Sequence, residues 1–195
     1  MVDPDTNNPN PVNPERILRA LDRRLVKPTR LILYGRAALA LGFPSPRLEF
    51  STTLDVDVIL PEVEMPIIEQ DSQFWDALQA ANTELEPDGL YLTHLFLDSQ
   101  IILTRDWSDR LVPIDFPGAD CLRLMRPSTA DLLLTKMMRV DPQDREDMLF
   151  LLQQPDLDRE SAEAAINGAV VPDIPEIREA FQSNATWLRS QISRL

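Results

Sequence analysis

The chain has 195 residues, of which 44% are hydrophobic and 26% are charged, so it can bury the core of one domain. It has 19 basic and 32 acidic residues, and a net charge of −13 argues against a broad basic surface for nucleic acid. The single cysteine, Cys121, excludes an intramolecular disulfide, and no segment approaches the roughly 20 apolar residues of a membrane span. With no secretory signal pattern at the N-terminus, these features predict a cytoplasmic protein that does not contact a membrane.

The first two thirds of the sequence predict a mixed α/β unit. Residues 1–13 are rich in Asn and Pro and are expected to form a disordered arm. Apolar residues three and four positions apart then indicate helices, whereas short apolar or alternating runs bounded by Gly and Pro indicate strands. The expected helices cover 14–26, 37–42 and 72–83, and the expected strands cover 30–35, 54–60, 90–97, 101–104 and 111–116. The unit is therefore assigned to residues 14–127.

The last third of the sequence predicts only helices. Ser128 and Asp131 form a start that is similar to a capping box, with Asp in the place of Glu. Asp141 followed by Pro142, then Asp158, then Pro175 mark three further helix starts. We therefore predict a C-terminal helical subdomain over residues 128–195.

Two carboxylates in one strand are the most informative feature of the sequence. Asp55 and Asp57 are separated by one residue, so in a strand they share a face, while Val56 points to the core. When two carboxylates lie so near each other and are partly buried, they favour binding a shared cation. Their hard oxygen ligands suit Mg²⁺ or Mn²⁺, which in turn binds a nucleoside triphosphate. The alternative is a solvated acidic pair on an edge strand.

A glycine precedes this strand by about twenty residues. Gly35 ends the strand over 30–35 and begins the next helix, which allows backbone N–H groups to face a phosphate. Alone, Gly35 is more typical of a plain turn. Together, a strand, a glycine, a helix and a strand with Asp-x-Asp form a rather specific order.

The run LYGRAALALGF…STTLDVDVIL resembles the core of the DNA polymerase beta-type nucleotidyltransferase superfamily. With Thr53 before the Asp pair, and the later run RPSTADLLLTKMMRVDPQDREDMLFLL, it is similar to bacterial nucleotidyltransferase-like proteins and to the abortive-infection toxin class. The resemblance spans about 31–152. It implies an α+β fold, with a nucleotidyltransferase-like mixed sheet, packed helices and a C-terminal helical subdomain.

The resemblance also implies site residues. Asp55 and Asp57 match the metal-binding carboxylates, and Gly35 matches the first glycine of the phosphate-binding turn. Thr53 precedes the pair as in the family and is expected to contact the nucleotide. Arg36 departs from the family pattern, because Gly or Ser is usual there, and its side chain either binds a phosphate of the nucleotide or blocks close approach to the backbone. Without a ligand, we expect the Arg36 side chain to fold against Asp55 or Asp57.

The second motif implies a basic and an acidic pair on successive helices. Lys136 and Arg139 match basic residues that face the triphosphate, and Asp144 and Asp147 match the acidic pair of the next helix. Each pair is three residues apart and so lies on one helix face. The alternative is a solvent-exposed helix hairpin with salt bridges between the helices.

A third catalytic carboxylate is expected at Asp115, at the end of the strand over 111–116, with Asp98 and Asp106 as rivals. Two functions remain open. The first is Mg²⁺-dependent transfer of a nucleoside monophosphate from a nucleoside triphosphate to a hydroxyl of an RNA, a protein or a small molecule. The second is a catalytically degenerate protein of this fold that binds a nucleotide or a partner protein, such as the cognate half of a toxin–antitoxin pair. The acidic surface would suit a basic partner.

Overall fold

A computed structural model describes residues 12–193 of the chain, and for Thr93 and His94 it describes the backbone alone. The predicted disordered arm over 1–13 therefore lies almost wholly outside the described residues. Within the described range, no helix is long and apolar enough to cross a bilayer.

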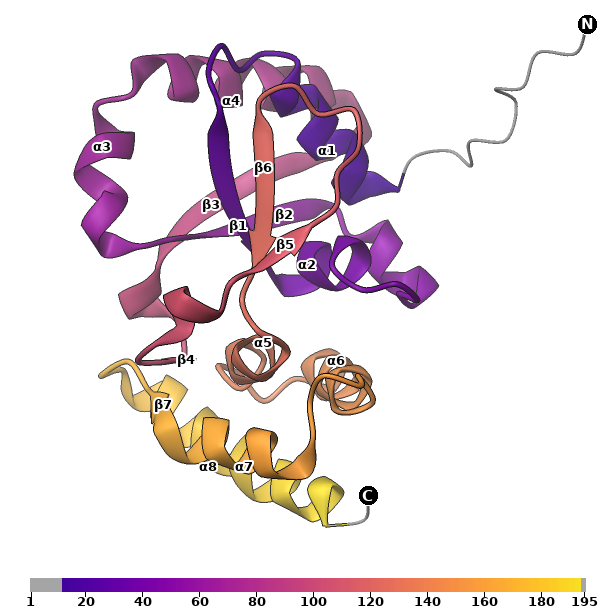
Figure 1. The fold of residues 1–195 in the computed structure, drawn as a ribbon, viewed down its shortest axis with the longest axis vertical. Helices are drawn as coiled ribbons and strands as arrows, with labels where there is room; N and C mark the ends of the chain where they lie inside the picture. The colour runs from indigo at the N-terminus through magenta and orange to yellow at the C-terminus, as the bar shows by residue number, and fades with distance from the viewer. Residues whose placement is uncertain (1–11, 194–195) are drawn as a thin grey trace, which may run out of the picture.

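A five-stranded mixed sheet forms the centre of the first part of the chain (Figure 1). The order of its strands is β3-β2-β1-β6-β5. The pairs β1–β6 and β2–β3 are parallel, whereas β1–β2 and β5–β6 are antiparallel. The strands are β1 (Thr29–Tyr34), β2 (Asp55–Leu60), β3 (Tyr91–Leu97), β5 (Val112–Ile114) and β6 (Leu122–Arg126). The predicted mixed sheet is confirmed, but β6 was not foreseen.

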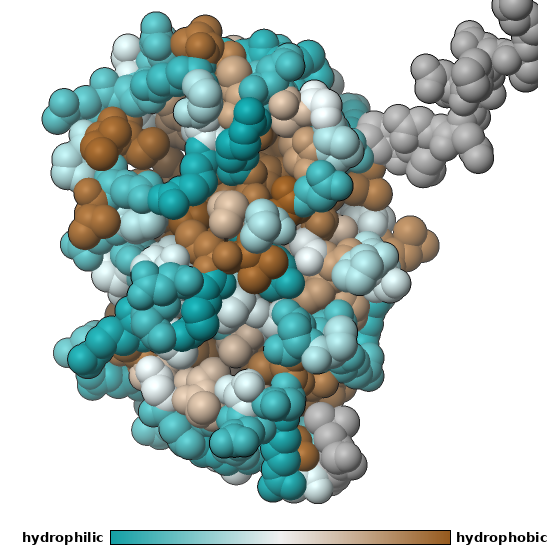
Figure 2. Space-filling view, viewed as in Figure 1, coloured by the Kyte–Doolittle hydropathy of each residue, from teal (hydrophilic) through white to brown (hydrophobic). Residues whose placement is uncertain are grey.

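Helices cover one face of this sheet. The helices α1 (Asn13–Asp22) and α4 (Ser72–Leu85) pack against each other and against the side of the sheet that carries Leu33, Val56 and Leu92. The short helix α3 (Met65–Glu69) connects β2 to α4 and buries none of its residues. Figure 2 shows hydrophobic surface in the region of α3.

The opposite face of the sheet is covered by the segment after β3. Ile32 and Ile59 on this face pack against Ile101, Leu103 and Trp107. The predicted strand over 101–104 shortens to β4 (Leu103–Thr104), which stands apart from the main sheet and pairs with β7 (Ala169–Val170). This two-stranded sheet joins the first part of the chain to its last third.

The last third is helical apart from β7, as predicted. Its helices are α5 (Thr129–Thr135), α6 (Pro142–Leu152), α7 (Arg159–Gly168) and α8 (Pro175–Ile192). The predicted cap of α5 is present, because the Ser128 hydroxyl accepts the N–H of Asp131 at 3.1 Å. Asp131 is fully buried and also accepts the N–H and the hydroxyl of Thr104, so it fastens α5 to β4.

Candidate functional site

The turn at the end of β1 places a glycine directly against one of the predicted carboxylates. Gly35 has a left-handed φ of +65° and begins α2 (Gly35–Leu41). Because β1 and β2 are antiparallel, Tyr34 pairs with Asp57. A Cβ atom at Gly35 would lie 3.1 Å from Oδ2 of Asp57, so only a residue without a side chain leaves that carboxylate in place.

The two carboxylates of β2 share one face, as the alternation predicts. Val56 between them is fully buried in the core, and Asp55 and Asp57 are half-buried. The Thr53 hydroxyl donates a hydrogen bond of 2.8 Å to Oδ1 of Asp55. Thr53 therefore orients the first carboxylate, which is a more indirect role than the nucleotide contact expected for it.

A cavity of about 250 Å³ opens beside Asp57 and is built from both parts of the chain. The sheet part contributes Gly35 and Asp57, and the turn between α5 and α6 contributes Lys136 and Arg139. The full lining is Tyr34, Gly35, Asp57, Phe96, Thr135, Lys136, Met138, Arg139 and Asp144. The sequence-predicted residues on either side of the cavity are therefore brought together, although about eighty residues separate them along the chain.

Lys136 and Arg139 form the cationic wall of the cavity, and buried aspartates of α6 form ion pairs with both. Nζ of Lys136 lies 2.7 Å from Oδ2 of Asp147 and 3.5 Å from Oδ1 of Asp144. Nε of Arg139 lies 2.5 Å from Oδ2 of Asp144. Lys136, Asp144 and Asp147 are buried, whereas the Arg139 side chain is 67% exposed. The salt bridges of the alternative hairpin are present, but its solvent exposure is wrong, since of these four residues only Arg139 is exposed.

Arg36 takes a partner other than the one expected. Its Nη2 lies 3.1 Å from Oδ1 of Asp147, and its Nε is 3.4 Å from Oδ2 of the same residue. The expectation that Arg36 folds against Asp55 or Asp57 is wrong. The physical reason is that Asp147 is fully buried, so its charge draws a second cation besides Lys136.

The expected third carboxylate does not join the pair. Asp115 is exposed and follows β5, where Ile114 pairs with Leu124. Because β6 runs parallel to β1 and antiparallel to β5, this end of β5 lies away from the end of β1 that carries Gly35. Asp115 is thus separated from the site by the order and direction of the strands, which the sequence does not display.

The two rivals of Asp115 have other partners. Asp98 accepts the backbone N–H of Glu62 at 3.1 Å, and Asp106 forms an ion pair with Arg110. The strand next to β2, β3, contains no acidic residue. Across residues 12–193, no group of three or more His, Cys, Asp or Glu side chains could hold a metal ion. Of the acidic residues, Asp57 and Asp144 line the cavity, and Asp55 lies next to Asp57 on the same face of β2.

The pair on β2 nevertheless fits one hard cation. Mg²⁺ is usually bound by one or two carboxylates and completes its shell with water and substrate phosphates. Asp55 and Asp57 supply two carboxylates on one face, and a cavity of about 250 Å³ lies beside Gly35 and Asp57. The donor set therefore suits Mg²⁺ or Mn²⁺ together with a phosphorylated ligand, and does not form a closed protein cage.

The pKa of the Tyr34 hydroxyl is raised by its surroundings in the cavity. Burial raises the pKa of its hydroxyl well above the ordinary value of 10.0, and the charges of Asp57 and Asp55 raise it further, while Arg139 opposes them. The Tyr34 ring also packs edge-on against Phe96. Tyr34 thus stays protonated at neutral pH, as a neutral wall of the cavity.

Four residues of the cavity were not predicted from the sequence: Tyr34, Phe96, Thr135 and Met138. Tyr34 and Thr135 directly precede the predicted residues Gly35 and Lys136, so this adjacency was a usable signal. Phe96 could not be found, because it reaches the cavity through the parallel pairing of β3 with β2. Met138 lies between two predicted cations on a turn that looked like a continuing helix.

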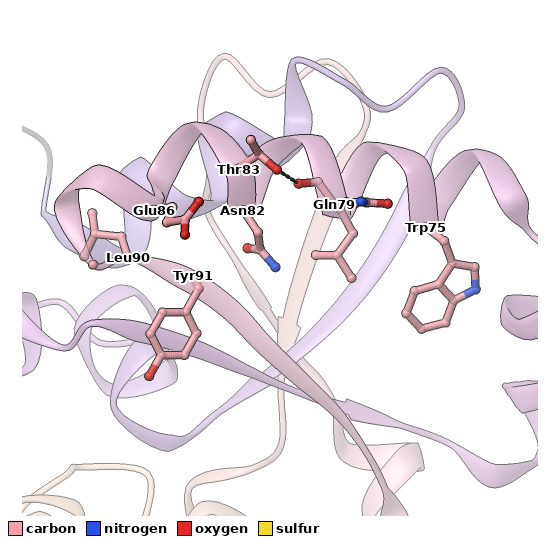
Figure 3. A pocket seen from close by; sticks show the side chains of 9 residues that line it. Trp75, Gln79, Asn82, Thr83, Glu86, Leu90 and Tyr91 are labelled. Atoms are coloured by element: carbon pink, nitrogen blue, oxygen red, sulfur yellow. Dashed lines mark hydrogen bonds between the residues drawn. The ribbon is translucent and has the colours of Figure 1, made fainter.

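A second hollow, of about 590 Å³, lies between α4 and the edge strand β3 (Figure 3). It contains none of the predicted site residues. Asn82 on its floor uses both ends of its amide to bind the backbone of Leu92, at 2.8 and 3.0 Å. The N–H and the carbonyl of Leu92 therefore have hydrogen-bond partners although β3 is an edge strand.

Comparison with known proteins relates the chain to a protein family. A family model described as "Nucleotidyltransferase of unknown function (DUF6036)" matches residues 16–187. Neither the curated proteins nor the solved structures give a match. The matched range includes the Gly35 turn, the Asp pair and the helices that carry the cationic wall.

Proposed function

The chain belongs to this family of nucleotidyltransferases of unknown function, and on that basis we propose that it transfers a nucleoside monophosphate from a nucleoside triphosphate to an acceptor hydroxyl with Mg²⁺. The observation that carries the proposal is one cavity that is lined by Gly35 and Asp57 from the sheet and by Lys136 and Arg139 from the turn after α5. A phosphate chain needs backbone N–H groups on one side and fixed positive charge on the other.

Each part of the site has a role in this reaction. Asp55 and Asp57 would hold Mg²⁺, which supplies positive charge at the phosphates when bound. Lys136 and Arg139 would offset the negative charge that develops on the departing pyrophosphate. Asp147 and Asp144 hold these two cations in place, so little reorganisation is required when the triphosphate enters.

The test is metal-dependent binding and turnover. We expect titration calorimetry to show binding of ATP, GTP, CTP or UTP with Mg²⁺, and Asp57→Asn to abolish the Mg²⁺ dependence. Asp57→Asn should also lower pyrophosphate release by about a hundredfold or more, because it removes a charge that acts on the reacting phosphates. The same assay with Mn²⁺ in place of Mg²⁺ tests which ion is used.

Asp115→Asn is the matched control, since Asp115 is an exposed carboxylate at the far end of the sheet. It should leave binding and turnover unchanged. If no triphosphate binds in the presence of either ion, or if Asp57→Asn binds as the wild type does, the proposal is wrong.

A second candidate function is binding without turnover, as a partner protein in a bacterial toxin–antitoxin pair. It is favoured by the lack of a third carboxylate beside Asp55 and Asp57 within the described residues. This second function would be supported if the protein binds a triphosphate in a metal-dependent way but releases no pyrophosphate with any RNA, protein or small-molecule acceptor tested. The net charge of −13 makes a basic protein the expected partner.

A further inference from the structure

A buried asparagine of the last helix holds the turn that carries the cationic wall. Asn184 on α8 is fully buried. Its Nδ2 donates to the backbone oxygen of Arg139 at 2.9 Å and to that of Met137 at 3.4 Å. Both oxygens belong to the turn that follows Thr135, the last residue of α5.

The side chain of Asn184 is poorly suited to a purely apolar packing role. Its Oδ1 is buried and has no hydrogen-bond partner among the described residues. An unpaired buried amide oxygen is destabilising, and leucine has the same branching without that oxygen. Asparagine at this position therefore contributes through the two hydrogen bonds that its Nδ2 donates.

The turn that these donors hold is one wall of the cavity. Thr135, Lys136, Met138 and Arg139 all line it, and the carbonyls bound by Asn184 belong to Met137 and Arg139. We infer that Asn184 is a positioning residue, which fixes the backbone on which the cations meet the triphosphate. The part of this inference that concerns the triphosphate rests on the proposed function. The restraint that Asn184 places on the turn does not depend on that function.

The test uses Asn184→Leu, which keeps the side-chain shape and removes both donors together with the unpaired oxygen. We expect amide hydrogen exchange at 136–140 to become about tenfold faster, since two restraints on the turn are lost. The dissociation constant of ATP with Mg²⁺ should rise about tenfold. In turnover, KM should rise more than kcat falls, because the chemical groups themselves are unchanged.

Leu188→Ala is the matched control. Leu188 is on the same helix, one turn further on, is equally buried and has no polar group. This variant should lower the melting temperature through its cavity, yet leave the exchange at 136–140 and the ATP affinity unchanged when both are measured on folded protein.

The outcomes separate this inference from the proposed function. If exchange at 136–140 in Asn184→Leu equals that of the wild type, or if Leu188→Ala speeds it equally, Asn184 does not position the turn. If the wild type binds no triphosphate, the proposed function is wrong, whereas the exchange measurement still decides whether Asn184 restrains the turn. If Asn184→Leu speeds exchange but binds ATP as the wild type does, the role of this restraint in binding is refuted.

Discussion

Gly35 has a φ of +65°, and a methyl group there would lie 3.1 Å from Oδ2 of Asp57. Gly35→Ala should therefore lower the free energy of unfolding by about 1–2 kcal/mol, the usual cost of a left-handed residue with a side chain. It should also displace the Asp57 carboxylate and weaken binding of ATP with Mg²⁺. Urea unfolding and titration calorimetry measure the two effects separately.

Gly89 provides a control with the same backbone strain. Its φ is +66°, but a Cβ there would have no atom within 4 Å. Gly89→Ala should lose similar stability and keep the wild-type affinity for ATP. Equal weakening of binding by both variants would show that contact with Asp57 is not the cause.

The residues that the sequence could predict are those set by local geometry. The shared face of Asp55 and Asp57 follows from strand alternation, and the position of Gly35 between a strand and a helix follows from the local sequence pattern. Arg36 and Asp115 were misjudged for a different reason. The counter-ion of Arg36 and the position of Asp115 depend on which elements become neighbours after folding, and no local pattern encodes that.

Among the elements, α2 and α6 are joined through one buried carboxylate. Asp147 accepts from both Arg36 and Lys136 and has no exposed surface. Asp147→Asn keeps the shape but leaves two cations short of a counter-charge. We expect the free energy of unfolding to fall by roughly 3 kcal/mol, as when one member of a buried ion pair is removed. Urea unfolding at pH 7 checks this value.

An exposed ion pair gives the comparison. Glu163 on α7 lies 3.2 Å from Nε of Arg189 on α8, and both side chains are partly open to solvent. Glu163→Gln should cost less than about 1 kcal/mol. A loss at Asp147 no larger than that at Glu163 would mean that the α2–α6 contact adds little to stability.

Elements with strong periodicity were predictable, and elements fixed by distant contacts were not. The helices α1, α4 and α6 and the strands β1 and β2 lie close to their expected positions. The strand β6 was missed because arginines interrupt its apolar pattern. Arg126, for example, is only 4% exposed and donates to the backbone oxygen of Gly42. The strand β7 was missed because two residues carry no periodic signal.

At the scale of the whole molecule, Asp22 links α1 to the start of β6, the strand that was not predicted. Its carboxylate accepts the N–H groups of Asp120, Cys121 and Leu122 at 2.7–3.0 Å. Burial raises the pKa of Asp22, but these three donors outweigh it and hold the pKa below the ordinary value of 3.8. The folded state therefore favours the charged form, and this contribution to stability is present above pH 3.8 and lost as the pH falls through the folded pKa.

Asp22→Asn should accordingly lower the free energy of unfolding at pH 7 by about 1–2 kcal/mol. Its difference from the wild type should shrink below pH 3.8, where the wild-type carboxylate also becomes neutral. Urea unfolding of both proteins from pH 7 to pH 3 measures this trend. A difference that stays constant over that range would contradict the assignment of the acid dependence to Asp22.

The place of Asn184 in the chain has a consequence for the time course of synthesis. The Gly35 turn and the Asp pair emerge early from the ribosome, the cations follow about eighty residues later, and the helix that braces them is the final one. A nascent or prematurely terminated chain can carry both carboxylates and still lack a fixed cationic wall. If the proposed function holds, a chain that ends before α8 should therefore bind a triphosphate more weakly than the full chain.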